Sequence, residues 1–356
     1  MILFRQMKIK KALKAFGDKG SNRRMSAIDF LASIDKPPVN ELIQSLSDKD
    51  SIVRECAARA LGRTGDQSVV PPLLHAIQTE ESGPTKAKML VALGEIGGST
   101  AKDALFAMLK DEPSDWTFRW VIKALDNGGI EPNSVEEKVY YFSARNDWNA
   151  VLDLGDMAIQ PLLSLIEAAE VIPCYPHSGA LPSPREQAKI LAEFGEGVVE
   201  PLLDAVVNAK GYLRSDAMWA LAIKGVQRAE SPLLKCLMKN DSRLRLEAIG
   251  ALGRLRSAKA TEPLVRIVED VNESDSVRWT AASALGEIAS PDTAAPLIKI
   301  LFNDDEYKTG RDLRDILLSA IVKIKGPTKK LCLDALNDKT LPPDVHIRCN
   351  KILARI

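Results

Sequence analysis

The sequence predicts an all-α fold, an α-α superhelix of about nine to ten stacked helix pairs, because three markers recur in constant phase. The string Ala-Leu-Gly ends at Gly62, Gly94, Gly253 and Gly286. Proline followed by two aliphatic residues begins at Pro72, Pro161, Pro201, Pro232, Pro263 and Pro296, and the last four lie 31 to 33 residues apart. An aliphatic residue followed by arginine lies eight residues before the glycine, as at Arg54, Arg245 and Arg278.

Each repeat has the pattern of two helices joined by a polar turn. The first helix is expected to begin at the proline. Proline lacks a backbone N–H, but the N–H groups of a first helical turn have no partner within the helix, so no hydrogen bond is lost there. Asp or Asn in the turn would cap the second helix. The second helix carries the aliphatic-arginine pair, and we expect it to end at the Ala-Leu-Gly glycine as a left-handed cap. Two such helices cannot bury both faces alone, so successive copies are expected to stack.

The pattern Pro-Leu-Leu, then Asp, then Val-Arg-x-x-Ala-Ala-x-Ala-Leu-Gly resembles the HEAT repeat, and most of all its short, phycobilisome-lyase-like variety. The resemblance covers roughly residues 36–356. It implies an α-solenoid in which the second helices line the concave face. It implies no single function, since proteins with this repeat include scaffolds, chaperone-like lyases and a metal-dependent hydroxylase.

Four segments are expected along the chain. Residues 1–35 would form a basic N-terminal helix and a capping half-unit, and residues 36–129 the N-terminal repeats. Residues 130–197 are degenerate repeats, with helices expected near 134–144 and 147–154. They include a loop, residues 171–184, whose four prolines argue against helix. Regular repeats are expected again over residues 198–356.

Charge and cysteine content exclude several classes of protein. Lys and Arg total 48 and Asp and Glu total 48, so zero net charge argues against nucleic acid as a partner of the whole chain. Five cysteines without CxxC spacing favour a reducing, cytoplasmic setting over a disulfide framework. No apolar run reaches the roughly 18 residues of a membrane span, and the first residues lack a signal-peptide core.

No catalytic residue, cofactor or metal is predicted. The deoxyhypusine hydroxylases, a HEAT family, hold two iron ions with repeated His-Glu pairs. Here the residues that follow the three histidines are Ala76, Ser178 and Ile347, which argues against that activity. Cys174 and His177 lack a second pair that would complete a zinc site. The sequence also lacks a nucleophile elbow, a P-loop and a dinucleotide-binding glycine set.

Arginines recur at the start of the second helices and have two interpretations. In HEAT repeats such residues form a hydrogen-bonded ladder between units, and the resemblance implies this structural role. A charge-assisted bond to a carboxylate of the neighbouring turn would suit it. Phosphate binding is the alternative. The arginines concerned are Arg54, Arg214, Arg245, Arg278 and Arg314.

Positions one and five residues after the arginine should point away from the buried stripe of the second helix. Several of them carry large or apolar side chains where a solvated surface would favour Lys or Glu. We predict that a protein partner binds there, although the tryptophans could instead pack between adjacent repeats. The candidate residues are Arg59, Val91, Trp120, Trp219, Leu246 and Trp279.

The first sixteen residues mix apolar and basic side chains, including Phe4, Met7, Lys8 and Lys14. They could form an amphipathic helix that touches anionic lipid or nucleic acid. The favoured interpretation is a capping helix over the open face of the first repeat.

Three functions follow from these observations. The first is a non-enzymatic scaffold or adaptor that binds a protein or peptide along its concave face. The second, implied by the resemblance, is a bilin-lyase-type or chaperone-type subunit acting on a chromophore protein. The third is a DNA-binding HEAT solenoid, which Glu55, Asp315 and zero net charge speak against.

Overall fold

The computed structural model of the chain describes residues 2–112, 114–170, 183–239, 241–303, 307, 310–324, 326–339, 341 and 343–356. These residues form α-helices and short 3-10 turns and contain no strand, so the predicted all-α class is confirmed. Their contacts divide the chain into two compact bodies, Met1–Pro182 and Ser183–Ile356. We call these the N-terminal body and the C-terminal body.

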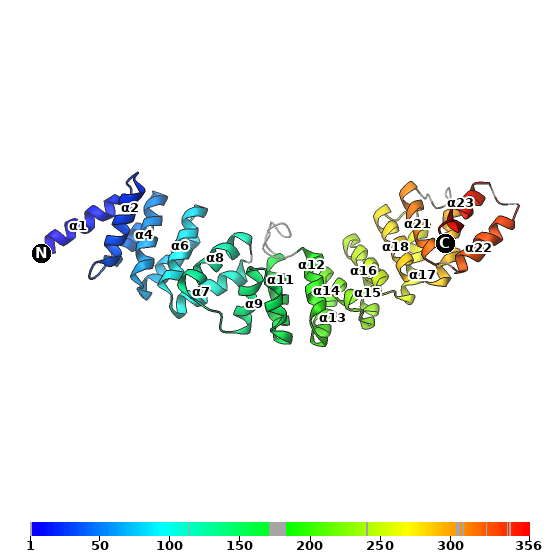
Figure 1. Ribbon diagram of the computed structural model, residues 1–356, viewed down its shortest axis with the longest axis horizontal. Coiled ribbons are helices and arrows are strands. Elements are labelled where there is room, and N and C mark those ends of the chain that lie inside the picture. Colours follow the sequence, from blue (N-terminus) through cyan, green and yellow to red (C-terminus); the bar gives the residue numbers. More distant parts are fainter. Residues whose placement is uncertain are drawn as a thin grey trace. The chain divides into compact units, whose positions relative to one another are not determined.

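The N-terminal body runs from α1 to α11 (Figure 1). Its helices are α1 (Ile2–Ala15), α2 (Ser21–Ser33), α3 (Val39–Ser45), α4 (Ser51–Thr64), α5 (Val70–Thr79), α6 (Gly83–Ile96), α7 (Gly98–Asp111), α8 (Asp115–Gly128), α9 (Val135–Ala144), α10 (Trp148–Leu152) and α11 (Ile159–Glu170).

The C-terminal body begins with α12 and ends with α23 (Figure 1). Its helices are α12 (Pro184–Glu193), α13 (Val199–Asn208), α14 (Gly211–Lys224), α15 (Glu230–Cys236), α16 (Ser242–Arg254), α17 (Thr261–Glu269), α18 (Asp275–Ile288), α19 (Ala294–Phe302), α21 (Arg311–Ile324), α22 (Gly326–Asn337) and α23 (Pro343–Leu353).

Consecutive helices pack as pairs, and the pairs stack within each body. Among the described residues, nine pairs are complete: α1 with α2 through α7 with α8, then α13 with α14 through α22 with α23. Within a body, each second helix also packs on the next second helix, as α4 does on α6 and α16 on α18. First and second helices therefore form two layers in each body, as Figure 1 shows.

The first helices begin earlier than the proline that was expected to start them. In α17 the helix starts at Thr261, directly after a 3-10 turn over Ala258–Ala260, and Pro263 is its third residue. The same offset occurs in α13, α15 and α19. A third position is still within the first turn, where the backbone N–H has no helical partner, so proline costs no bond there.

Acidic residues of the turns cap the second helices. The side chain of Asp50 accepts a hydrogen bond from the backbone N–H of Ile52 at 2.9 Å, at the start of α4. The side chain of Asp241 does the same for Leu244 at 3.1 Å, at the start of α16. Each carboxylate thereby pairs one of the N–H groups that a helix start leaves without a partner.

The prediction that the Ala-Leu-Gly glycines form left-handed caps is wrong. Gly62, Gly253 and Gly286 lie inside their second helices, whereas other residues with positive φ terminate them, such as Gly65 after α4 and Gly225 after α14. The repeated glycines instead make close contact with the next second helix. A Cβ atom at Gly62 would lie 2.9 Å from Cα of Ala92, and the same approach recurs in the C-terminal body.

The end of the predicted proline-rich loop also needs correction. Residues 171–182 of that loop lie outside the described residues. Pro184 is not loop but the first residue of α12, and Ser183 caps this helix. The Glu186 carboxylate in turn accepts a hydrogen bond from the Ser183 backbone N–H at 3.0 Å. A proline at the first helical position after such a capping box is a favourable start, which the count of prolines alone did not reveal.

The degenerate repeat contains the two expected helices, α9 and α10. Ion pairs join α9 to α7: Lys102 pairs with Glu137 at 3.0 Å, and Lys110 pairs with Glu136 at 3.0 Å. The Tyr140 hydroxyl donates to Glu136 at 2.8 Å. Polar contacts thus supplement the apolar packing where the repeat pattern is weakest.

Substituting Gly94 should test the close approach of the second helices. A Cβ atom at this position in α6 would lie 2.0 Å from the carbonyl oxygen of Ala124 in α8, which no side-chain rotation can relieve. We therefore expect Gly94→Ala to lower the free energy of unfolding by about 3 kcal/mol. Gly83→Ala, at the start of the same helix, is the control, since its nearest atom is 3.9 Å away. Urea denaturation of both variants would measure this, and equal stabilities would contradict the packing role.

Candidate partner-binding surface

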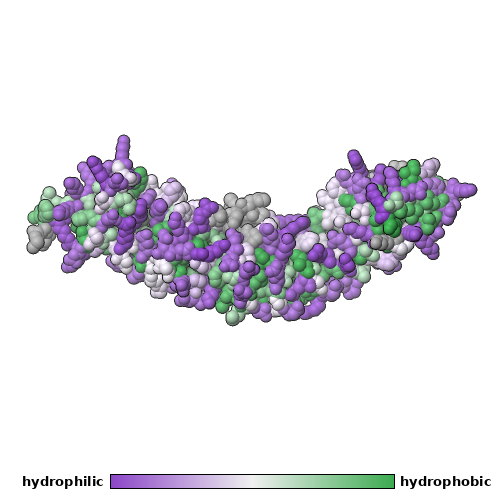
Figure 2. All heavy atoms as spheres, viewed as in Figure 1, coloured by the Kyte–Doolittle hydropathy of each residue, from purple (hydrophilic) through white to green (hydrophobic). Residues whose placement is uncertain are grey.

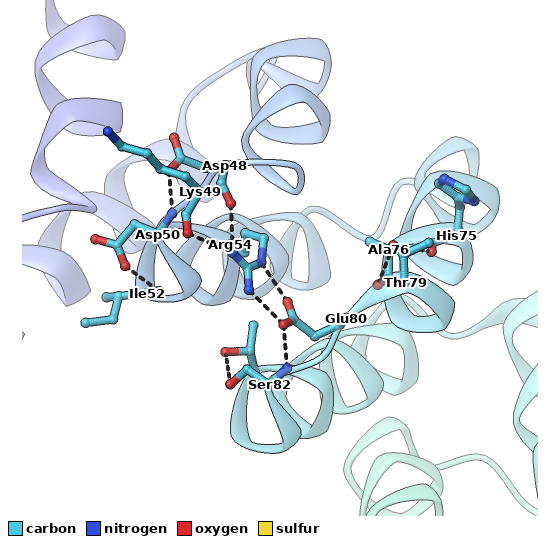
Figure 3. A network of polar contacts seen from close by, with 11 residues as sticks. Asp48, Lys49, Asp50, Ile52, Arg54, His75, Ala76, Thr79, Glu80 and Ser82 are labelled. Atoms are coloured by element: carbon cyan, nitrogen blue, oxygen red, sulfur yellow. Dashed lines mark hydrogen bonds and ion pairs between the residues drawn. The ribbon is translucent and has the colours of Figure 1, made fainter.

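A network of polar contacts lies where one repeat meets the next, around Arg54 at the start of α4 (Figure 3). Its guanidinium donates two hydrogen bonds, both 2.7 Å long, to the carboxylate of Glu80 in the following repeat. It also donates to the backbone carbonyl of Asp48, in the turn of its own repeat, at 2.8 Å. The Glu80 carboxylate in turn accepts from the Ser82 backbone N–H at 2.8 Å. This group therefore joins two successive turns.

The C-terminal body contains two related contacts. Arg245 of α16 forms an ion pair of 2.5 Å with Glu273, which precedes α18. Arg278 of α18 is buried and donates to the carbonyl oxygens of Val268, at 3.0 Å, and Tyr307, at 2.6 Å. In each case the arginine of one second helix reaches the turn of the following repeat.

The other two repeated arginines are placed similarly on their helices. Arg214 of α14 donates to the carbonyl oxygen of Val207 at 3.4 Å, and Arg314 is half-buried on α21. At the corresponding position of α6 the chain has Lys86, whose ammonium lies 5.8 Å from the ring centre of Trp116. The contact pattern is thus not uniform along the chain.

The electrostatics of these arginines follow from their partners and their burial. Hydrogen bonding by Arg54 lowers the pKa of the Glu80 carboxyl, and the same bond raises the pKa of Arg54. Burial lowers the pKa of Arg278, against the charges of Asp275 and Asp270, which raise it. Guanidinium remains charged in proteins, so these groups act as fixed hydrogen-bond donors rather than as proton carriers.

In the N-terminal body, the three candidate residues of the second-helix face are half-buried. Arg59 of α4 pairs with Glu55 of the same helix at 3.4 Å. Trp120 of α8 has the ammonium of Lys123 5.1 Å from its ring centre. Val91 lies on α6 between them in sequence. The side chains are thus available to solvent in part, although each also contacts its surroundings.

In the C-terminal body, Trp219 of α14 contacts helices on both sides. Its indole N–H donates to the carboxylate of Glu247 on α16, and the Arg185 guanidinium of α12 lies 5.6 Å from its ring centre. A Cβ atom at Gly250 would lie 2.8 Å from the indole ring, so the ring covers this glycine. Trp219 is nonetheless only half-buried. It therefore packs between repeats and also contributes to the surface.

Leu246 and Trp279 continue this face on the next two second helices, α16 and α18, and both are half-buried. Beyond them, Asp315 of α21 is exposed. The positions one residue after Lys86 and Arg214 are Ala87 and Ser215, and both are buried. The periodicity therefore does not place every such residue on the surface. We call Trp219, Leu246 and Trp279, with Glu247 and Gly250, the tryptophan face.

The described residues contain no cluster of His, Cys, Asp and Glu that could hold a metal ion. Cys174 and His177 lie outside the described residues. His75 is exposed on α5, and the His346 ring lies 3.0 Å from the carbonyl oxygen of Asp338.

Comparison with known families now identifies the repeat. The family described as HEAT repeats matches residues 39–126, 199–275 and 230–314, more than half of the chain. The chain belongs to the HEAT-repeat family. No curated protein matches it significantly.

Solved structures of other HEAT-like solenoids are similar in fold. They include the E. coli protein YibA, with 16% identity over 87% of this chain and 99% of that chain, and a TM-score of 0.38. Human deoxyhypusine hydroxylase has 19% identity over 91% of this chain and 98% of its own, with a TM-score of 0.32. Kap121p bound to Pho4p has 16% identity and a TM-score of 0.46, over 97% of this HEAT chain and 45% of Kap121p.

Sequence reasoning missed the acidic partners of the HEAT arginines. Glu80 and Glu273 lie six and five residues before the next ladder position, at Lys86 and Arg278. The sequence points to an Asp or Asn in the turn of the arginine's own repeat, but the observed carboxylates come from the following repeat. The available signal was an acidic residue five or six residues before the arginine position of the next repeat. Glu247, which holds Trp219, had no repeated counterpart to reveal it.

Breaking the Arg54 group should destabilise the N-terminal body. Arg54→Met leaves the Glu80 carboxylate, whose side chain is 1% exposed, without its main partner. We expect a loss of about 2–3 kcal/mol in the free energy of unfolding, since an unpaired buried charge is costly. Lys110→Met removes an ion pair with Glu136 in which both side chains are about half exposed. This change should leave the free energy of unfolding nearly unchanged. Chemical denaturation compares the two, and an equal effect would mean that the Arg54 group is not structural.

The same group should give a defined pH dependence. Because the pKa of Glu80 in the folded state lies below its ordinary value of 4.5, its ionised form stabilises the fold above that value. This contribution is lost as the pH falls through the lowered pKa. The difference in unfolding free energy between wild type and Glu80→Gln should therefore be largest near neutral pH and shrink on acidification. A difference that is constant with pH would contradict the ion pair.

Proposed function

We propose that the protein is a non-enzymatic HEAT scaffold or adaptor that binds a protein partner along its second helices. The observation that carries this proposal is the tryptophan face, where Trp219, Leu246 and Trp279 are only half-buried on three successive second helices. Large apolar side chains in a row on a surface typically anchor protein interfaces, with tryptophan the most frequent among strong anchors.

The contacts of Trp219 support a binding role because they hold the ring in one place. The hydrogen bond to Glu247, the guanidinium of Arg185 and the missing side chain at Gly250 together fix the indole. A side chain that is already ordered loses little conformational entropy when a partner covers it. The exposed part of the ring is therefore a preorganised contact area.

The charges around the tryptophan face favour a protein over nucleic acid. Glu247 lies against Trp219, and Asp315 is exposed on α21. Carboxylates at these positions would repel a phosphate backbone, whereas a peptide can avoid or pair with them. The HEAT resemblance implies that second helices line a concave face, so we place the partner there.

The ladder arginines are proposed to be structural rather than part of the partner site. Arg54, Arg245 and Arg278 already use their guanidinium groups on carboxylates or carbonyls of neighbouring turns. A phosphate would have to displace these bonds. The groups that remain for a partner lie farther along the second helices, at the tryptophan face.

Trp279→Ala and Leu246→Ala should weaken partner binding without unfolding the protein. Each should raise the Kd about 30-fold, which corresponds to about 2 kcal/mol at an interface anchor. Trp219→Ala should also lower stability, because its ring packs on Gly250. The partner would be obtained by affinity capture from the native host, and its affinity measured by calorimetry.

The matched control for this prediction is Val207→Ala, an apolar residue that is 61% exposed on the first helix α13. It should leave the Kd unchanged. A photoreactive amino acid at exposed Ser283 of α18 should cross-link to the partner, whereas one at Val207 should not. Cross-linking through Val207 alone, or unchanged affinity of the Trp279 and Leu246 variants, would reject the tryptophan face as the site.

A further inference from the structure

The N-terminal helix α1 uses only one of its faces for packing. Ala12 and Phe16 are buried, and Ile9 and Leu13 are half-buried, on the side that faces the rest of the N-terminal body. Arg5 reinforces this attachment, because its guanidinium donates to the backbone carbonyls of Asp35 and Lys36 after α2. These contacts fix the rotation of α1 about its own axis.

The opposite face of α1 carries a second apolar cluster, which is exposed among the described residues. Leu3 is 78% exposed, Phe4 is 64% exposed and Met7 is 67% exposed. At 100° per residue, Leu3, Phe4 and Met7 lie on the side opposite Ile9 and Phe16. A helix whose packing needs are already met by its inner face has no structural reason for three large apolar residues outside.

Basic residues surround this outer cluster. Lys8, Lys10, Lys11 and Lys14 are all exposed, and α1 contains no acidic residue. The Lys8 ammonium lies 4.7 Å from the ring centre of Phe4, so charge and apolar surface are in direct contact. Figure 2 shows hydrophobic and hydrophilic residues side by side at this end of the molecule.

An open hollow of about 1060 Å³ lies next to this face, between α1 and α2. Lys8, Lys11, Lys14 and Arg23 line it above a floor that includes Ala12 and Phe30. Arg23 also pairs with Asp18 at 3.0 Å, and this is the acidic group that lines the hollow. A shallow surface hollow lined by four cations and one carboxylate is suited to several anionic groups that approach from solvent.

We propose that α1 is an interfacial anchor for an anionic lipid surface. Leu3, Phe4 and Met7 enter the region just below the headgroups, while the lysines and the hollow hold headgroup phosphates. An apolar cluster and a basic patch on one helix are the two signals that stable interfacial binding needs. With 14 residues α1 is shorter than the roughly 20 residues of a membrane span, so it would lie along the surface.

The apolar cluster favours a lipid surface over nucleic acid as the partner of α1. A phosphate backbone would be attracted by the lysines but would leave Leu3, Phe4 and Met7 without an apolar partner. A lipid surface satisfies both kinds of side chain at once. This surface belongs to the N-terminal body and uses none of the residues proposed to bind the protein partner.

The test measures sedimentation of the full chain with vesicles. Wild type should bind phosphatidylcholine vesicles that contain about one third phosphatidylglycerol, and should bind pure phosphatidylcholine at least tenfold more weakly. Lys10→Gln with Lys11→Gln should weaken binding about 30-fold, since each lysine near an anionic leaflet contributes a factor of about five. Phe4→Gln with Met7→Gln should weaken it at least tenfold.

The matched control is Met238→Gln with Lys239→Gln in the C-terminal body, where Met238 is 85% exposed and Lys239 is also exposed. It should bind vesicles like wild type, and all variants should keep the melting temperature. Each of the following results would overturn the proposal: no vesicle binding, equal binding to neutral vesicles, an effect of the lysines without one of Phe4 and Met7, or tighter binding to single-stranded or duplex nucleic acid. A wild-type dimer that the Phe4 and Met7 changes dissociate would equally reject it, since a second copy would then cover this face.

Discussion

The close approach of successive second helices is the constraint on which the rest of each body depends. Gly253 would place a Cβ atom 2.9 Å from Cα of Ala284, and Gly286 would place one 2.8 Å from Cα of Ala320. Only glycine against alanine allows this distance, so the repeated small residues set the spacing of the second layer. The same spacing creates the position of Trp219, because its ring can cover Gly250 only where that residue has no side chain.

The two ends of a second helix are fixed by different interactions. Near its C-terminal end the glycine contact sets the distance to the next helix, and near its start the arginine reaches the following turn, as Arg54 reaches Glu80. These two contacts hold both ends of the helix, and among the outward side chains Trp219 adds packing on Gly250. We therefore expect substitutions at positions such as Val91, Leu246 and Trp279 to alter this surface with little effect on the stacking.

Periodicity was enough to predict the fold but not the purpose of each repeated residue. A marker that recurs every 31 to 33 residues predicts a helix pair, and the pairs are present. The same marker cannot say whether a glycine such as Gly62 ends a helix or touches its neighbour, since both uses favour glycine. Glu80 was missed because its partner Arg54 lies 26 residues away, in another repeat. Trp219 had two interpretations, and its contacts combine them, since the ring packs on Gly250 while the residue as a whole is only half-buried.

The distribution of charge gives the proposed anchor a further property. Five of the 48 basic residues lie on α1, which has no acid, so the other residues carry 43 Lys or Arg against 48 Asp or Glu and a net charge of −5. An anionic surface would therefore attract α1 and repel the remainder of the chain taken together. Zero net charge of the whole chain conceals this asymmetry. Attraction that is confined to one helix would attach the protein at α1 while the tryptophan face stays free for a protein partner.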